Sequence, residues 1–148
     1  MTMQTRTTAP AAVLITRLAR SIYRFVDERE LGMTLKQYAM LNSLRDVDGI
    51  TQGNLGDAMC IDANTTVLLL NGLEERGFAV RERDPGDRRR HIVRITRAGT
   101  KALVRGDRAV EAVTEDALGP LEEDERAALG GLLAKALGDG ALAVTPEG

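Results

Sequence analysis

Residues 78–96 constrain the fold most, because they predict a β-hairpin in a chain whose other patterns are helical. Two short strand-like runs, 78–83 and 91–95, flank the tetrapeptide Asp84-Pro85-Gly86-Asp87, which is typical of a turn. In the second run apolar and polar residues alternate, as in a strand with one buried face. The sequence therefore predicts a hairpin, and its many arginines make it a basic arm.

The charge of the chain is unevenly distributed. Residues 76–101 hold nine basic and three acidic residues, a net charge of +6, whereas the whole chain carries -2, which leaves -8 for the rest. The overall acidity alone argues against nucleic acid as a partner, since DNA affinity comes largely from neutralising phosphates. The separation of basic from acidic residues instead indicates one face that binds a polyanion and another face that does not contact it.

The other patterns predict helices. Apolar residues recur every three or four positions, and four helices have an expected N-cap: Thr34, which forms a capping box with Gln37, and Thr51, Asp62 and Thr96. The predicted helices cover residues 10–30, 35–47, 52–59, 63–76, 97–117 and 122–137. With almost no aromatic residues available, the core must be aliphatic.

A short helix, a tight turn, a capped helix and a basic hairpin follow one another in the order of a winged helix-turn-helix. The second helix of such a pair fits the major groove of B-DNA, and the hairpin can place an arginine in the minor groove. Thr66, Leu69, Leu70 and Leu73 are expected to pack inward, so the candidates to face DNA are Asn64, Thr65, Val67, Leu68 and Asn71. For Val67 and Leu68, a place in the core or in an interface remains equally open.

Three segments resemble the MarR family of bacterial regulators: residues 55–57, residues 73–78 and above all residues 81–99, which contain an Asp-Pro-x-Asp-Arg-Arg pattern. The resemblance covers about residues 10–137. It implies a mainly α-helical fold with a small β-hairpin wing, and a triangular dimer. The helices in 10–32 and 98–138 would dimerise, 33–97 would form the DNA-binding domain, and 1–9 and 139–148 would be flexible tails.

The resemblance also assigns residue roles. Asp87 braces Arg89, which enters the minor groove, while Arg88 and Arg90 face phosphates or brace the wing, and Arg81 joins the DNA-binding set. Family members often bind aromatic or phenolic compounds between the dimer helices and the DNA-binding lobe, and here Arg17, Tyr23, Tyr38 and Met40 could border that cleft, although ordinary packing also explains them. The family often has Thr-Arg where this chain has Val67-Leu68, which leaves base recognition open.

The remaining residues favour plainer interpretations. Cys60 is the only cysteine, so no intrachain disulfide can form, and its apolar neighbours predict a buried, inert thiol. His91 has no second histidine at metal spacing, so a hydrogen bond or a phosphate contact is expected. Acids at residues 122–125 suit a solvated first helical turn, and Gly130-Gly131 would allow close helix approach across a dimer.

These features predict a homodimeric DNA-binding regulator, a repressor of a palindromic operator that a small aromatic ligand releases. No cofactor, metal or membrane partner is expected, and the absence of a signal sequence and of a membrane-spanning run indicates a cytoplasmic protein. An enzyme is disfavoured because no acid/base or nucleophile set is visible. The alternative is a winged-helix protein-interaction module that lacks DNA readout, which the apolar surface of the second helix would suit.

Overall fold

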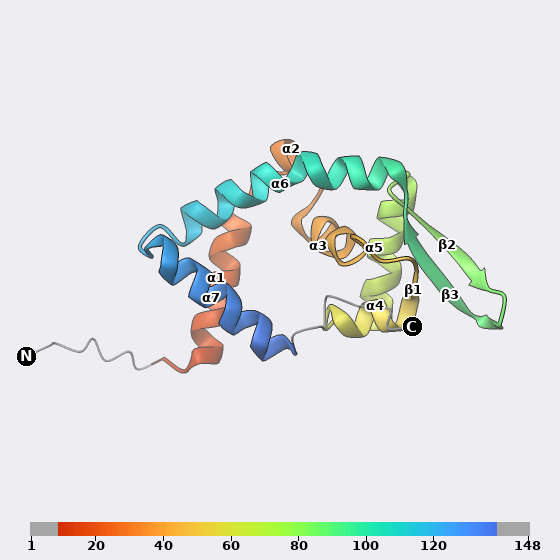
Figure 1. Ribbon diagram of the computed structural model, residues 1–148, viewed down its shortest axis with the longest axis horizontal. Coiled ribbons are helices and arrows are strands. Elements are labelled where there is room, and N and C mark those ends of the chain that lie inside the picture. Colours follow the sequence, from red (N-terminus) through yellow and green to blue (C-terminus); the bar gives the residue numbers. More distant parts are fainter. Residues whose placement is uncertain (1–8, 139–148) are drawn as a thin grey trace, which may run out of the picture.

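A computed structural model describes residues 9–138 of the chain and shows a mostly helical protein with a small antiparallel sheet (Figure 1). The predicted fold class is confirmed. The expected tails lie outside the described residues, apart from Ala9. The elements in chain order are α1 (Ala11–Phe25), α2 (Glu28–Leu31), α3 (Leu35–Ser43), β1 (Ile50–Thr51), α4 (Gln52–Ala58), α5 (Ala63–Glu75), β2 (Ala79–Asp84), β3 (Asp87–Ile95), α6 (Arg97–Ala117) and α7 (Glu123–Leu137).

The predicted N-caps are confirmed by their hydrogen bonds. The hydroxyl of Thr34 accepts from the backbone N–H of Gln37 at 3.0 Å, and the Gln37 side chain accepts from the backbone of Thr34. Asp62 caps α5 by accepting from the N–H of Thr65 at 2.7 Å, while Thr51 caps α4 and Thr96 caps α6. Each side chain satisfies a backbone donor that has no partner within the helix.

The first predicted helix, 10–30, is wrong as a single element. Helix α1 ends at Phe25, Val26 is extended, and the separate short helix α2 begins at Glu28. The Asp27 carboxylate accepts a hydrogen bond from the N–H of Arg29 at 2.9 Å. Aspartate offers the backbone such an alternative to a continuous helix, and the apolar spacing did not reveal it.

The segment between α3 and α4 also differs from prediction. Helix α3 ends at Ser43 instead of continuing to residue 47, and Asp46 has a positive φ of 59° in the turn that follows. That turn returns the chain to the unpredicted strand β1, whose Ile50 pairs with Val93 of β3. The sheet therefore has the order β1-β3-β2. Both Ile50 and Val93 are buried, so this pairing depends on tertiary packing.

The core is aliphatic, as expected, and lies between α6 and the helices beneath it. Its completely enclosed side chains include Leu31, Met40, Leu41, Leu55, Leu70, Leu73, Val93 and Leu103. Helix α6 contacts α1, α2 and α3. A Cβ at Gly106 would lie 3.1 Å from Leu31 Cδ1 and 3.2 Å from the Tyr38 ring, so glycine allows α6 to pack closely there.

Helices α1 and α7 lie at the end of the molecule opposite the wing (Figure 1). Neither contains a buried residue, although both carry large apolar side chains. Helix α1 packs on α6, whereas α7 continues from α6 without extensive contact to another described element. Over the described residues, the helices include none that combines the length and hydrophobicity needed to span a bilayer.

Candidate nucleic-acid interface

Helices α4 and α5 form a compact helix-turn-helix. The N–H of Ile61 donates to the carbonyl of Gly56 at 3.0 Å, and Cys60 between the helices has a φ of 59°. A Cβ at Gly56 would lie 2.6 Å from Thr66 Oγ1, so only glycine lets the two helices approach this closely. The prediction of a buried thiol is wrong, because Cys60 is exposed at this turn.

Helix α5 turns one face inward and the opposite face outward. Thr66, Leu70 and Leu73 are buried against the domain. Asn64, Leu68 and Asn71 follow one another at intervals of four and three residues on the exposed face, while Thr65 and Val67 are half-buried. Because Leu68 keeps 62% of its surface exposed, the structure excludes a core position for it within this chain.

Arg81, which was predicted to contact DNA, lies against the C-terminal end of α5. Its guanidinium donates to Glu74 Oε1 from Nη2 at 2.7 Å and from Nε at 3.2 Å, and Nη2 also donates to Asn71 Oδ1 at 2.6 Å. Hydrogen bonding from Arg81 holds the pKa of Glu74 below its usual value. Sequence reasoning assigned no role to Glu74, and its signal was its place in residues 73–78, one of the three segments singled out above.

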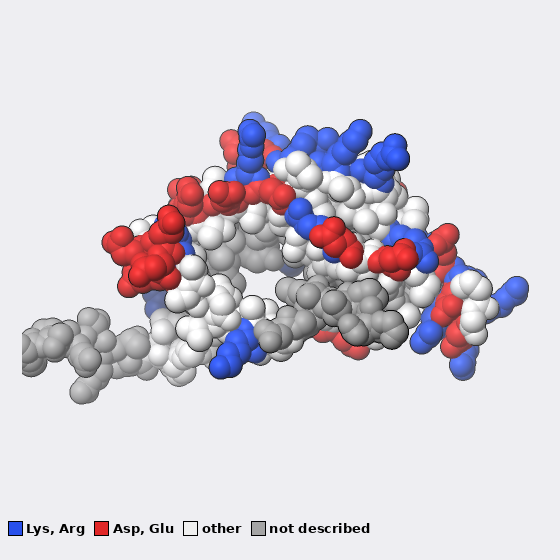
Figure 2. Space-filling view, viewed as in Figure 1, with Lys and Arg blue, Asp and Glu red and all other residues white. Residues whose placement is uncertain are grey.

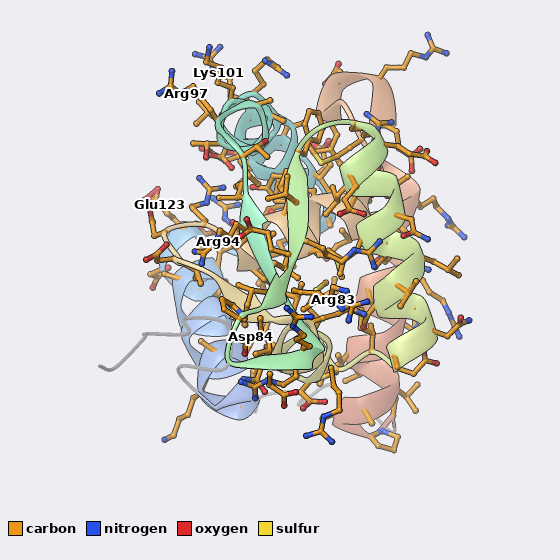
Figure 3. All side chains as sticks on the ribbon, turned by 90° about the vertical axis from the view of Figure 1, so that its right-hand side faces the viewer. Arg83, Asp84, Arg94, Arg97, Lys101 and Glu123 are labelled. Carbon is orange, nitrogen blue, oxygen red and sulfur yellow. The ribbon has the colours of Figure 1, made fainter. Side chains whose placement is uncertain are left out.

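The wing is the β2–β3 hairpin, and its register is irregular near the tip. Arg83 pairs with His91 and Asp84 with Asp87, which leaves residues 88–90 of β3 without partners on β2. Such bulges redirect side chains away from the sheet. The three consecutive arginines are all exposed there. Figure 3 labels Arg83 and Asp84 near the tip of the same hairpin.

Asp87 holds Arg89 at this bulge. Its Oδ1 accepts from the backbone N–H of Arg89 at 3.1 Å and from Nε at 3.2 Å, while the Arg89 side chain remains 90% exposed. Hydrogen bonding from Arg89 lowers the pKa of the Asp87 carboxyl. The carboxylate thus limits the orientations of the guanidinium without covering it.

Asp84 organises the other side of the turn. One carboxylate oxygen accepts from the N–H of Gly86 and the other from Arg90 Nη2, both at 2.9 Å. These contacts, the Gly86 bond foremost, lower the pKa of Asp84. Arg83 donates to the backbone carbonyl of Arg88 at 2.6 Å, which ties the two strands together.

A hollow of about 460 Å³ separates the wing from the helix-turn-helix. Arg89, Arg90 and His91 line one side, and residues of α4 and the start of α5 line the other. Gln52 contributes a buried Oε1 that has no hydrogen-bond partner within the described chain. The hollow therefore brings wing cations beside the helix-turn-helix, as an interface for a polyanion requires.

The surface charge is segregated along α6, whereas the wing carries cations and carboxylates together. Figure 2 shows cations along the first half of α6 and around the wing, and carboxylates where α6 meets α7. Arg97, Lys101, Arg105 and Arg108 belong to the first group, and Glu115, Asp116 and Glu122–Glu125 to the second. Among the residues with defined positions, no cluster of histidine, cysteine or carboxylate side chains could hold a metal ion.

The four residues expected at a ligand cleft differ in their exposure to solvent. Arg17 and Tyr23 are exposed on α1. Tyr38 is buried and donates to Asp107, which also binds Arg45 Nη2 at 2.7 Å. Burial, aided by the Asp107 hydrogen bond, raises the pKa of Tyr38 to about 12. Met40 has no exposed surface, so it packs in the core and borders no open cleft.

A capped helix packed on a short one, followed by a basic hairpin, defines the winged helix-turn-helix class. The sequence profile of the MarR family matches residues 33–91. A putative transcriptional regulatory protein for the hcr operon of Thauera aromatica is 38% identical over 102 residues, which cover 69% of this chain but only 61% of that protein. The transcriptional regulator HosA of Escherichia coli O111:H- is 35% identical over 94 residues, which cover 64% of this chain and 70% of HosA.

Solved structures agree with this assignment. A crystal structure of MarR matches with a TM-score of 0.78 and 29% identity, covering 90% of this chain and 92% of that one. A mutant MarR from E. coli complexed with operator DNA matches with a TM-score of 0.72 and 26% identity, over 86% and 94% of the two chains. The PcaV regulator from Streptomyces coelicolor, in complex with its natural ligand, has a TM-score of 0.70 and 29% identity, over 88% and 96%. The chain belongs to the MarR family; it is a DNA-binding transcriptional regulator and not an enzyme.

Proposed function

We propose that this chain is a homodimeric repressor that binds a palindromic operator, with α5 in the major groove and Arg89 in the adjacent minor groove. The observation that carries the proposal is the exposed, Asp87-held Arg89 at the wing bulge, beside the hollow that the wing shares with α4 and α5. Held arginines suit a narrow minor groove, where the negative potential is enhanced. Arg88 and Arg90 supply phosphate contacts at the same bulge.

Replacing Arg89 tests this arrangement. Arg89→Ala should weaken operator binding and reduce the slope of log K against log salt by about 0.9 for each phosphate that the arginine neutralises. Arg108→Ala is the matched control, since it removes one exposed cation from α6, away from the wing. Operator affinity measured across a salt series gives both quantities. If Arg89→Ala binds the operator as tightly as the wild type does, the wing is not part of the DNA interface.

Dimerisation is supported by the apolar side chains of α1 and α7, which the rest of the described chain covers only in part. Seven of them are exposed: Val13, Leu14, Ile15, Phe25, Leu132, Leu133 and Leu137. Two-fold pairing would bury these side chains and match the symmetry of a palindromic site. Sedimentation of the full chain should show a dimer at micromolar concentration, and Leu132→Glu should shift it toward monomer. A wild-type monomer would contradict the proposal.

Release by a small aromatic or phenolic ligand is the regulatory part of the proposal. Its support is the PcaV complex, together with the exposed Arg17 and Tyr23 near the dimer helices. A panel of benzoates and phenolic acids, titrated into the protein–operator complex, should include a compound that frees the DNA. Tyr23→Ala should weaken its effect while leaving DNA affinity unchanged.

The exposed Leu68 favours a second candidate, a winged-helix module that binds a protein and has lost DNA readout. Selection of genomic fragments by the purified chain separates the two functions. Enrichment of a palindromic sequence supports the regulator, whereas no enriched fragment supports the interaction module.

A further inference from the structure

Helix α5 offers DNA no free cationic or acceptor-rich side chain at the centre of its exposed face. Leu68 occupies that centre, and its neighbours one turn away on the same line are Asn64 and Asn71. Arg81, the nearest arginine on the hairpin, already donates to Glu74 and Asn71. Along this exposed line, the groups available for base contact are therefore one large apolar side chain and two amides.

The orientation of the Asn71 amide follows from its partner. A guanidinium can only donate hydrogen bonds, so the Asn71 atom that lies 2.6 Å from Arg81 Nη2 must be the carbonyl oxygen. Arg81 occupies one of the two lone pairs of that oxygen, whereas the amide nitrogen keeps both of its donors for a base. Among bases in the major groove, guanine presents two adjacent acceptors, O6 and N7, whereas adenine presents one acceptor beside a donor.

Leu68 can recognise only an apolar group. The C5-methyl group of thymine is the apolar feature that the major groove offers, and cytosine lacks it. We propose that Leu68 selects a thymine through its methyl group and that Asn71, oriented by Arg81, selects a guanine in the same half-site. Arg81 and Glu74 are positioning residues in this scheme, and the inference rests on the proposed function.

The position of Leu68 favours DNA over a protein partner as the occupant. It is a single exposed leucine between two amides on a helix whose opposite face is buried, and its apolar neighbours in the sequence, Val67 and Leu69, are half-buried. Amides beside a lone apolar side chain suit base edges, where polar atoms and methyl groups alternate. A protein-docking surface typically has a wider apolar patch with aromatic anchors.

The test uses the full chain in two stages. Genomic fragments are first selected and the operator is located by footprinting, which tests the proposed function alone. Each operator thymine is then replaced by uracil, which removes only the methyl group, and each guanine by 7-deazaguanine, which replaces N7 by C–H. Affinities are compared for the wild type, Leu68→Ala, Asn71→Ala and the control Val104→Ala, whose parent side chain is similarly exposed on α6.

Uracil at one thymine in a single half-site should weaken wild-type binding about fourfold, the effect of removing one buried methyl group, and the same change in both half-sites should weaken it about 15-fold. Leu68→Ala should bind both DNAs equally, whereas Val104→Ala should keep the wild-type response. 7-Deazaguanine should weaken binding by the wild type but not by Asn71→Ala.

The methyl contact would be overturned if no uracil substitution changed the affinity of the wild type, or if uracil weakened binding by Leu68→Ala as much as by the wild type. A flat deazaguanine scan would overturn the role of Asn71. Either of these results contradicts only the base contacts, because the protein still binds its operator. If no genomic fragment is selected in the first stage, the proposed function itself is contradicted.

Discussion

Replacing Gly56 by alanine should separate the helix-turn-helix pair at its closest point. The new Cβ would lie 2.6 Å from Thr66 Oγ1, but 3.5 Å from the carbonyl oxygen of Ile61 and 3.6 Å from Thr66 Cβ, which are ordinary contacts. One hydroxyl oxygen therefore accounts for the whole clash. Overpacking of this kind costs about 1–3 kcal/mol, while alanine gains up to about 1 kcal/mol over glycine in a helix. We expect Gly56→Ala to lower the free energy of unfolding by about 1–2 kcal/mol.

Removing that oxygen should rescue the substitution. Thr66→Ala alone loses the buried hydrogen bond from Oγ1 to the carbonyl of Asp62, 2.8 Å long, and should cost about 1–2 kcal/mol. In the double variant the clash is absent, and alanine at position 56 still has a more favourable helix propensity than glycine. Its stability should therefore equal or exceed that of Thr66→Ala, with a favourable coupling of about 2 kcal/mol between the two substitutions.

Urea unfolding of the wild type, both single variants and the double variant gives this coupling directly. Gly53→Ala is the matched control: it lies in the same helix, and a Cβ there meets nothing within 4 Å, so it should be neutral or slightly stabilising. Additive effects of Gly56→Ala and Thr66→Ala would refute the argument that a single oxygen sets the helix spacing.

Two other outcomes follow from specific contacts. Asp107→Asn should lower the free energy of unfolding at pH 7 by about 1 kcal/mol, less than a buried charged hydrogen bond contributes, because the Arg45 and Asp107 side chains are 32% and 40% exposed. Hydrogen bonding from Arg45 lowers the pKa of Asp107, so this stabilisation is present above the unfolded-state pKa of about 3.9 and is lost as pH falls through the folded value. Chemical unfolding of both proteins from pH 7 to 3 should show their difference shrinking, and a constant difference would contradict the ion pair. The exposed Cys60 should react with a thiol reagent in native buffer about as fast as in urea, and protection that persists until unfolding would contradict its exposure.

Short sequence patterns predicted the helices that begin directly after a capping side chain. Asp62 and Thr96 placed the starts of α5 and α6 correctly, because a side-chain cap acts within three residues of its own position. The same locality explains the failures. Strand β1 exists because Ile50 is buried against Val93, more than forty residues away, and a two-residue strand has no periodicity of its own.

In the candidate site, too, the features set by neighbouring residues were predicted and those set by contacts between elements were not. The turn tetrapeptide and its arginines pointed to the wing, and the contact between Asp87 and Arg89 spans only two residues. By contrast, Arg81 is engaged by Glu74 and Asn71 of another element, Met40 is enclosed, and Cys60 is exposed by a left-handed turn. Composition could not distinguish an arginine that is available to DNA from one that braces a helix.

The amino-acid sequence by itself determined where the capped helices begin and where the basic hairpin lies, because caps, turn residues and apolar spacing act over a few neighbouring positions. Only the tertiary structure decided which side chains of α5 face outward, which arginines are already paired, and that α1 and α7 keep their apolar faces uncovered within one chain. Those properties depend on distances between segments far apart in the sequence, which are set when the elements pack around a shared core.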